Sequence, residues 1–425
     1  MRFHHLPASF VSLLLALTPT TTLSHTASHL QHPLTFPVAH STDYQENLRR
    51  AESAYHVLQA QYYNPAKGLY NTTGWWNAAN IITTIANLAI VNPALSPEIE
   101  SILRNTYERA PESNPAGLGA GYEKIVDGET YLITTSWGES TEEDVGKRKK
   151  KGRSVSNGGW LNDYYDDEAW WALAWLRSYD LTQNTTYLNT SISIFTDLHH
   201  SLPTPCGGIW WNKAHTYVNA ITNELFLAVA ASLANRASSA GERKQYLDIA
   251  ITQWKWFVTS GMINKEWNIN DGLSRDCVNN RGTVWSYNQG VILEGLSELW
   301  IATSDDEYLV FAKEIATAAL NKLTNKNEIL SDVCERNGCG ADGVQFKGVF
   351  LRGLMGLYRV LEEGEVKERV GEFVNRNAES VWRSDRDERG RIGVVWDGPL
   401  REVNAGSHGS GLDALVAGAD LGSFR

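Results

Sequence analysis

The sequence predicts an all-α protein in which six helical hairpins close into a ring, the (α/α)6 toroid. Three observations support this fold class. Apolar residues recur with a period of about 3.6 along most of the chain, which is typical of amphipathic helices. Alternating patterns that would indicate β-strands are sparse. The starts of every second predicted helix also recur at broadly similar intervals, which gives the chain a loose six-fold repeat.

The periodicity predicts about twelve helices along the chain. They cover residues 42–64, 75–91, 96–109, 163–179, 185–200, 217–236, 241–260, 284–302, 305–322, 345–362, 364–384 and 407–418. The second helices of the hairpins start at residues 75, 163, 217, 284, 345 and 407. Because these starts recur at broadly similar intervals, one closed ring explains the chain better than two separate domains.

The entry segments predict which helices form the inner ring. Gly- and Trp-rich entries precede four of the second helices, at residues 74–77, 158–162, 207–212 and 282–285. The partner helices open with polar residues instead, as at 240–248 and 304–309, which is typical of helices on an outer surface. We therefore expect the ends of the inner helices to gather polar and aromatic side chains.

Residues 1–28 are predicted to be a secretory signal peptide, and residues 29–425 a single catalytic domain. Arg2 precedes the apolar run 10–17, which is too short to span a bilayer. No later stretch reaches membrane length, and residues 418–425 lack the hydrophobic tail of a lipid-anchor signal. The sequence therefore predicts a secreted protein without a membrane span.

Composition indicates a neutral partner. The formal net charge is −11 and the sequence pI is about 5.5, so no global positive field is present to hold nucleic acid or an anionic membrane. The chain also contains 16 Trp and 17 Tyr, whose flat rings can stack while offering a polar edge. Such rings suit a carbohydrate.

The four cysteines predict disulfides, because an even number in an exported chain is typically oxidised. Three pairings are possible, and we prefer Cys334 with Cys339 and Cys206 with Cys277, since the first pair brackets a turn-like segment. Three sequons predict N-glycosylation, at Asn71, Asn184 and Asn189.

The strongest chemical candidate lies at residues 162–175, where four carboxylates crowd the start of an apolar helix: Asp163, Asp166, Asp167 and Glu168. Capping and the helix dipole explain one or two of them. Asp166 and Asp167 are adjacent, so their repulsion should keep one protonated while the other ionises. Glycoside cleavage needs one protonated and one ionised carboxyl. The two carboxyls of retaining enzymes lie roughly 5–5.5 Å apart, and adjacent residues reach this separation more easily than the wider spacing of inverting enzymes.

Other motifs bear on binding and on cofactors. Three Trp pairs, 75–76, 170–171 and 210–211, should each place one ring in the core and the other toward the site. Residues 285–289 combine an aromatic ring, a phenol and two amides, a set that can hold a sugar. The sequence has no zinc-protease, phosphate-loop, calcium-loop or serine-hydrolase signature, so we expect neither a metal nor a cofactor.

Six segments together resemble glycoside hydrolase family 76, the endo-α-1,6-mannanases and related fungal cell-wall proteins. They stand in the family's order and cover most of the mature chain: residues 165–182, 206–211, 217–226, 271–277, 285–291 and 346–352. One departure is Val218, where the resemblance would lead us to expect a lysine beside Asn219.

The resemblance implies a retaining mechanism without a metal, with Asp166 as nucleophile and Asp167 as general acid and then base. The substrate-binding candidates are Trp76, Asn77, Asn80, Asn162, Trp211, Asn219, Asn223, Asp276, Trp285, Tyr287, Asn288 and Gln289. The expected partner is α-mannan, and the expected form is a secreted, cell-wall-associated monomer.

Three functions follow from the sequence. The first is an endo-α-1,6-mannan hydrolase, which the missing anchor tail favours. A cell-wall transglycosidase would use the same carboxylates but resolve the intermediate with a sugar hydroxyl. A non-catalytic mannan-binding protein would keep the aromatic residues, although the intact Asp166 and Asp167 count against it.

Overall fold

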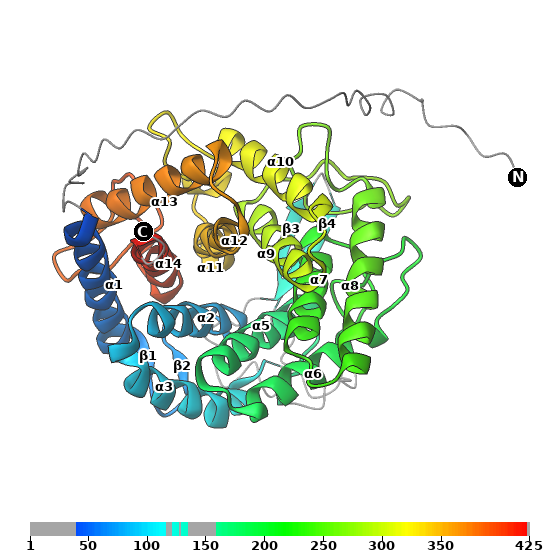
Figure 1. The fold of residues 1–425 in the computed structure, drawn as a ribbon, viewed down its shortest axis with the longest axis horizontal. Helices are drawn as coiled ribbons and strands as arrows, with labels where there is room; N and C mark the ends of the chain where they lie inside the picture. Colours follow the sequence, from blue (N-terminus) through cyan, green and yellow to red (C-terminus); the bar gives the residue numbers. More distant parts are fainter. Residues whose placement is uncertain (1–39, 116–120, 127–128, 135–158, 423–425) are drawn as a thin grey trace, which may run out of the picture. The chain divides into compact units, whose positions relative to one another are not determined.

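The inner helices of the ring form a closed circuit of neighbours. In this computed structural model, which describes residues 40–115, 121–126, 129–134 and 159–422, they pack in chain order, and the last packs against the first. The six are α2 (Trp75–Val91), α5 (Tyr165–Thr182), α7 (Ala220–Arg236), α9 (Ser286–Thr303), α12 (Phe346–Val360) and α14 (Ala405–Leu421). Figure 1 shows these helices surrounded by a second layer.

The outer layer consists of the partner helices of the six hairpins. They are α1 (His40–Tyr62), α3 (Ser96–Arg109), α6 (Thr185–His200), α8 (Ala240–Ser260), α10 (Glu307–Lys322) and α13 (Glu365–Ser384). Each packs on an inner helix, as α8 does on α7 and α1 on α14. The all-α prediction and the (α/α)6 toroid are therefore confirmed.

Burial explains why the two layers differ in sequence. Every residue of α14 is buried, and a helix that is enclosed on all sides can be apolar or small all round. α13 instead buries a stripe that includes Val370, Phe373, Val374 and Val381, at the spacing of one helical face. Its remaining surface is largely charged, as expected of an outer helix.

Short elements connect the helices. β1 (Tyr63–Asn64) pairs with β2 (Leu69–Tyr70), and β3 (Gly121–Val126) pairs antiparallel with β4 (Glu129–Thr134). Single helical turns lie at η1 (Pro93–Leu95), η2 (Ala110–Ser113), η3 (Val333–Arg336) and α11 (Gly340–Gly343). The β3–β4 hairpin is an addition to the predicted elements, because the sequence predicted no secondary structure between residues 110 and 162.

The predicted starts of three inner helices were two or three residues early. Tyr164 bridges Asn212, Asn219 bridges Gly272, and Trp285 caps α9 in an extended conformation. These residues pair with loops or cap a helix, so their backbones leave the helical conformation before α5, α7 and α9 begin. The connecting loops thus meet the inner helices at their N-terminal ends.

Both preferred disulfides are present, Cys206 with Cys277 and Cys334 with Cys339. The sequon residues Asn71, Asn184 and Asn189 are all exposed, and their glycosylation stays a prediction. The proposed signal peptide lies outside the described residues. Among the described helices, none alone is long and apolar enough to cross a membrane, although α2 and the sharply bent segment after it would pass that test together.

Candidate active site

The two adjacent aspartates lie in the first turn of α5, where the N-terminus of an inner helix meets the loop before α7. Tyr165 donates its backbone N–H to the carbonyl of Trp211 at 2.9 Å, and Tyr164 bridges Asn212. This pairing fixes the helix start and brings the loop alongside the carboxylates. Unsatisfied backbone N–H groups and the helix dipole make this end favourable for negative charge. We call Asp166 and Asp167 the aspartate pair.

Asp166 is half-buried and accepts one strong hydrogen bond. The indole Nε1 of Trp211 donates to its Oδ2 at 3.0 Å, whereas its Oδ1 is buried without a hydrogen-bond partner among the described residues. Burial raises the pKa of Asp166 to about 7, and the Trp211 hydrogen bond opposes that rise. One oxygen of this carboxyl is therefore oriented and the other is left unbonded.

Asp167 is more deeply enclosed, with 7% of its surface exposed. Asn162 Nδ2 donates to its Oδ2 at 2.8 Å. Burial and then the charge of Asp166 raise the pKa of Asp167 well above its ordinary value, while the Asn162 hydrogen bond lowers it. The pair is therefore expected to titrate as a unit, and the deeper burial of Asp167 favours its protonated form.

A third carboxylate, Glu168, is set apart from the pair by a cation. Glu168 is fully buried, and Lys213 Nζ lies 2.8 Å from its Oε1. The same oxygen accepts the backbone N–H of Asn162 at 2.7 Å. Lys213 also contacts Asp197 of α6 at 2.8 Å. Of three consecutive acids, two have no cationic partner among the described residues and the third has one.

Further acids approach the pair from other inner-ring positions. Asp342 of α11 accepts a hydrogen bond from Trp76 Nε1 at 3.1 Å, and its charge contributes to the raised pKa values of both Asp166 and Asp167. Asp271 is buried and accepts from Tyr217 at 2.8 Å. Burial and then the charges of Asp271, Asp166 and Asp342 raise the pKa of Tyr287, so the N-terminal ends of the inner helices gather carboxyls near this phenol.

Such an arrangement matches known proteins. Residues 47–415 match the sequence family described as glycosyl hydrolase family 76. The chain belongs to this family of glycoside hydrolases. It is 28% identical over 279 residues to the mannan endo-1,6-alpha-mannosidase DFG5 of Candida albicans, which covers 59% of this chain and 60% of that protein. Alignments with the first three curated relatives span between 47% and 63% of their lengths.

Solved structures share the family 76 fold. An inactive variant of the alpha-1,6-mannanase GH76A of Salegentibacter sp. HEL1_6, in complex with alpha-1,6-mannotetrose, superposes with a TM-score of 0.69. Its identity to this chain is 19%, and the match covers 88% of this chain and 99% of that one. Dfg5 from Chaetomium thermophilum, in complex with glucosamine, gives a TM-score of 0.65 at 16% identity, covering 90% and 91%.

Three of the predicted binding residues of this family 76 chain lie beside the aspartate pair. Asn162 and Trp211 donate directly to it, and Trp76 donates to Asp342, whose charge acts on both aspartates. Tyr287 is half-buried and stacks on Phe346, with ring centroids 3.9 Å apart. Asp166 is among the charges that raise the pKa of Tyr287, after burial and Asp271.

Most of the predicted amides are instead tied to the scaffold. Asn77 accepts from the Gly74 N–H and caps α2, and Asn219 accepts from the Thr222 N–H and caps α7. Asn223 bonds the backbone of Ile209 in both directions. These amides satisfy backbone groups at helix starts and loops, so their hydrogen bonds position the site.

The remaining candidates vary in their surroundings. Asn80 receives a hydrogen bond from Arg352, and Gln289 bonds the backbone of Ile269 in both directions. Asn288 is fully buried, and neither of its amide atoms has a hydrogen-bond partner in the part of the chain that is described. Trp285 caps α9 and is 9% exposed, whereas Asp276 lies exposed on its loop.

The Trp pairs behave differently from their prediction. In the pairs 75–76 and 170–171, both rings are buried, because Trp75 packs on Trp171 and Trp76 stacks on Trp170. The paired rings join α2 to α5 in the core. Only the third pair is divided, with Trp210 half-buried and stacked on exposed His215.

Sequence reasoning missed Lys213, Asp342 and Asp271. Asp271 lay within a recognised motif, but Asp276 was chosen from it. Lys213 follows the Trp210 and Trp211 pair by two residues, which was the available signal. Asp342 had no local signal, because it approaches the pair only through the closure of the ring.

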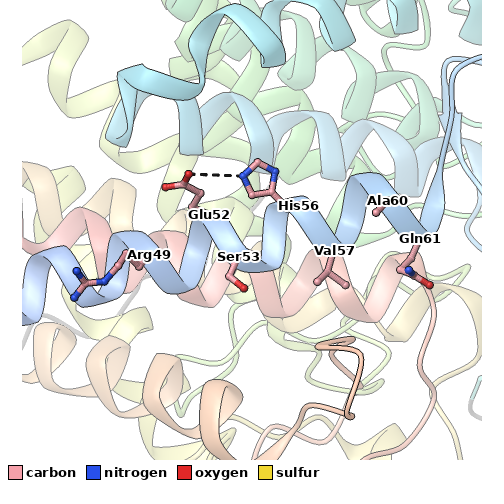
Figure 2. Close-up of a pocket in the computed structure, with 7 residues that line it drawn as sticks. All are labelled: Arg49, Glu52, Ser53, His56, Val57, Ala60 and Gln61. Carbon is pink, nitrogen blue, oxygen red and sulfur yellow. Dashed lines mark ion pairs between the residues drawn. The ribbon is translucent and has the colours of Figure 1, made fainter.

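Two hollows lie away from the aspartate pair. Figure 2 shows one on α1, where all seven lining residues come from that single helix and His56 lies 3.7 Å from Glu52. The other is a cavity of about 240 Å³ toward the C-terminal ends of the inner helices, lined by Arg177, Arg236, Arg352 and Arg359 among others. Neither includes Asp166 or Asp167.

Proposed function

We propose that this protein is a secreted, retaining endo-α-1,6-mannanase that works through the aspartate pair as a single catalytic domain. The observation that carries the proposal is the unequal environment of two adjacent carboxyls: Asp166 is half-buried and accepts an indole N–H, whereas Asp167 is 7% exposed and accepts an amide N–H. Glycoside cleavage by retention requires one ionised nucleophile and one protonated acid.

The first step transfers a mannosyl group to the enzyme. The Asp166 carboxylate attacks the anomeric carbon, and Asp167 gives its proton to the departing glycosidic oxygen as that bond breaks. The indole of Trp211 orients the Asp166 carboxylate, and the amide of Asn162 orients Asp167. The products are a mannosyl ester on Asp166 and a free sugar hydroxyl.

The second step restores the enzyme. Asp167, now ionised, takes a proton from water as the water oxygen attacks the same anomeric carbon and the Asp166 ester bond breaks. Two inversions give net retention. The adjacency of the two carboxyls on one helical turn favours this route over an inverting one, which needs room for water between wider-spaced carboxyls.

The substrate proposal comes from the relatives. The DFG5 protein of Candida albicans is named a mannan endo-1,6-alpha-mannosidase. In the inactive GH76A variant that binds alpha-1,6-mannotetrose, two consecutive aspartates are replaced, and this chain also carries consecutive aspartates at an inner-helix start. The two disulfides support an oxidising, extracellular location.

The test is incubation of the secreted protein with debranched α-1,6-mannan while NMR follows the anomeric configuration of the first products. We expect α-configured oligomers. Asp166→Asn and Asp167→Asn should each reduce kcat by a factor of about 100 to 10,000 or more. Asp248→Asn, an exposed change on outer helix α8, is the matched control and should keep full activity.

Three outcomes would contradict parts of the proposal. Products that appear first in the β configuration would exclude retention. Mannosyl transfer to an added oligosaccharide in preference to water would identify a transglycosidase. Mannan that binds without cleavage, by wild type and both variants alike, would identify a binding protein.

The roles within the pair need a second substrate. With an α-mannosyl oligosaccharide that carries a good aryl leaving group, the first step no longer needs a proton donor. Asp167→Asn should then form the intermediate quickly, whereas Asp166→Asn should remain inactive. The reverse pattern would exchange the two roles.

A further inference from the structure

The loop residues 211–213 lie along the start of α5. Their side chains contact two of its three consecutive acids, and their backbones pair with residues just before those acids. Trp211 accepts the Tyr165 N–H through its carbonyl, and Lys213 donates its backbone N–H to the Asp163 carbonyl at 3.0 Å. From this backbone pairing the side chains diverge. Trp211 reaches Asp166, and Lys213 reaches Glu168. One loop segment therefore holds two of the three acids.

Glu168 connects this loop to the second catalytic candidate. Its Oε1 lies 2.8 Å from Lys213 Nζ and accepts the backbone N–H of Asn162 at 2.7 Å. The Asn162 side chain then donates to Asp167 Oδ2 at 2.8 Å, while its own Oδ1 accepts the Tyr164 N–H at 2.8 Å. The chain of contacts runs from Lys213 through Glu168 and Asn162 to Asp167.

Glu168 has features that a surface ion pair lacks. Its side chain is completely buried, and Lys213 is 14% exposed, so solvent screens their attraction only weakly. A lone buried carboxylate would take up a proton, because burial disfavours its charged form. Burial raises the pKa of Glu168 well above its ordinary value, and the Lys213 charge is the main influence that opposes this rise. The 2.8 Å contact places that cation where it stabilises the ionised form of Glu168 next to Asp167.

We propose that Lys213 and Glu168 are positioning residues, which together hold Asn162 against Asp167 and place a fixed negative charge beside it, so that Asp167 keeps the proton it donates. This inference rests on the proposed function. Neither residue has to touch the substrate. They act through the orientation and the protonation of Asp167.

The charges around both groups are consistent with this role. Asp167 faces Asp166 and Glu168 on its own helix and Asp342 on α11, and all three disfavour loss of its proton. Glu168 faces Lys213 from the loop and Asp197 from α6, with the Lys213 ammonium 5.4 Å from the ring centroid of Tyr165. Lys213 is the only cation among these described neighbours.

The alternative is that the ion pair only stabilises the fold. The pH profile of kcat/KM separates the two, because its alkaline limb reports loss of the proton from the free enzyme's acid. Glu168→Gln removes the fixed charge but keeps an oxygen for the Asn162 N–H. We expect its alkaline limb to move to lower pH by about one unit.

Lys213 supplies the second arm of the test. In Lys213→Met, Glu168 loses its cation and should become protonated, so the alkaline limb should move in the same direction as in Glu168→Gln. The double variant should shift no further than Glu168→Gln alone, since both changes remove one charge. Lys213→Arg keeps the cation and should restore the wild-type profile.

Asp197→Asn is the matched control, because Asp197 contacts the same Lys213 nitrogen at the same 2.8 Å but has no contact with Asn162. We expect a lower Tm with an unchanged pH profile. Circular dichroism across the pH range confirms that each variant is folded where its rate is measured.

Each result decides the inference. Unchanged alkaline limbs in folded Glu168→Gln and Lys213→Met, with wild-type mannanase activity present, would reduce the pair to a structural role. A shift of Lys213→Met to higher pH would show that Glu168 stays ionised without its lysine, which also contradicts the proposal. If Glu168→Gln does not fold, the contrast between Lys213→Met and Lys213→Arg still decides. A wild-type protein that cleaves no mannan would instead refute the proposed function.

Discussion

The two ends of the inner-helix ring differ in how their carboxylates are paired. At the N-terminal ends, half-buried Asp166 and buried Asp167 have an indole and an amide as their hydrogen-bond donors. Toward the C-terminal ends, arginines meet carboxylates directly: Arg236 contacts both oxygens of Asp180 at 2.7 Å and also reaches Glu298 at 3.3 Å. Arg352 lies 2.7 Å from Asp413. The aspartate pair has no contacting cation among the described residues, whereas Asp180, Glu298 and Asp413 each have one.

The helix dipoles explain the sign at each end but not the difference in pairing. Carboxylates suit the N-terminal ends of parallel inner helices, and cations suit the C-terminal ends. A ring built only for stability would pair the N-terminal carboxylates as well, as it does for Glu168. The absence of a contacting cation among the described residues agrees with the proposed catalytic role of the aspartate pair, because an adjacent cation would favour ionisation of both carboxyls.

The largest expected effect in this comparison is at the C-terminal ends. Arg236→Gln should lower the free energy of unfolding by about 3 kcal/mol, because it leaves Asp180 and Glu298 without their shared cation. Mannanase kcat/KM should remain at the wild-type level. Urea unfolding and initial rates measure the two quantities.

The control for this change is Lys244→Gln on outer helix α8. Lys244 forms an exposed ion pair with Asp248 four residues later, and such pairs contribute less than about 0.5 kcal/mol. A large loss of activity in Arg236→Gln at full stability would break the comparison, since the C-terminal ends would then take part in catalysis.

The fold was largely predictable from the sequence because its information is local. The 3.6-residue periodicity and the repeated entries specify twelve helices and their alternation, and ring closure follows once each inner helix must bury its whole surface. The errors lie at helix starts such as Tyr165, where the preceding residue pairs with a distant loop and is therefore not helical. Pairing partners that are far apart in the sequence leave no periodic signal.

The residues of the site also divide into those that the sequence could identify locally and those that it could not. Asp166 and Asp167 were identifiable because they are adjacent in the sequence, and Trp211 because it belongs to an aromatic motif. Lys213 contacts Glu168 from the loop before α7, and Asp342 lies on the short helix α11, so only the folded ring brings them near the pair. The amides of Asn77 and Asn223 were assigned to substrate, yet both bond the backbone or other scaffold groups. Composition cannot distinguish an amide that caps a helix from one that binds a sugar.

A second prediction concerns how Asp166, which has no contacting cation among the described residues, affects the free energy of unfolding. The folded-state pKa of Asp166 is about 7, above its ordinary value of 3.8, so the native state binds this proton more tightly than the unfolded chain does. Wild-type stability should therefore fall as pH rises from about 4 to about 7 and change little above that from this group. Asp166→Asn carries no such charge.

Because solvent screening at half-buried Asp166 reduces the effect of this shift, we expect Asp166→Asn to be more stable than wild type by about 1 kcal/mol at pH 8, with the gain disappearing near pH 4. Urea unfolding at both pH values measures it, and the exposed Asp248→Asn is the control. An equal difference at the two pH values would mean that the substitution acts through packing and not through charge.

The smallest effect is expected at Glu294, which lines the C-terminal cavity but forms no hydrogen bond or ion pair among the residues that the structure describes. Burial raises the pKa of Glu294, but the charges of Arg352, Arg177 and Arg236 offset part of the rise. Glu294→Gln should change the free energy of unfolding by no more than about 0.5 kcal/mol, because relief of burial and loss of those attractions nearly cancel. Its kcat/KM should be unchanged. Glu294→Gln could instead give the pH-dependent gain in stability that we expect of Asp166→Asn. In that case, an unpaired carboxylate would not by itself identify the catalytic end of the ring. The proposed catalytic role would then rest only on the coupling between Asp166 and Asp167.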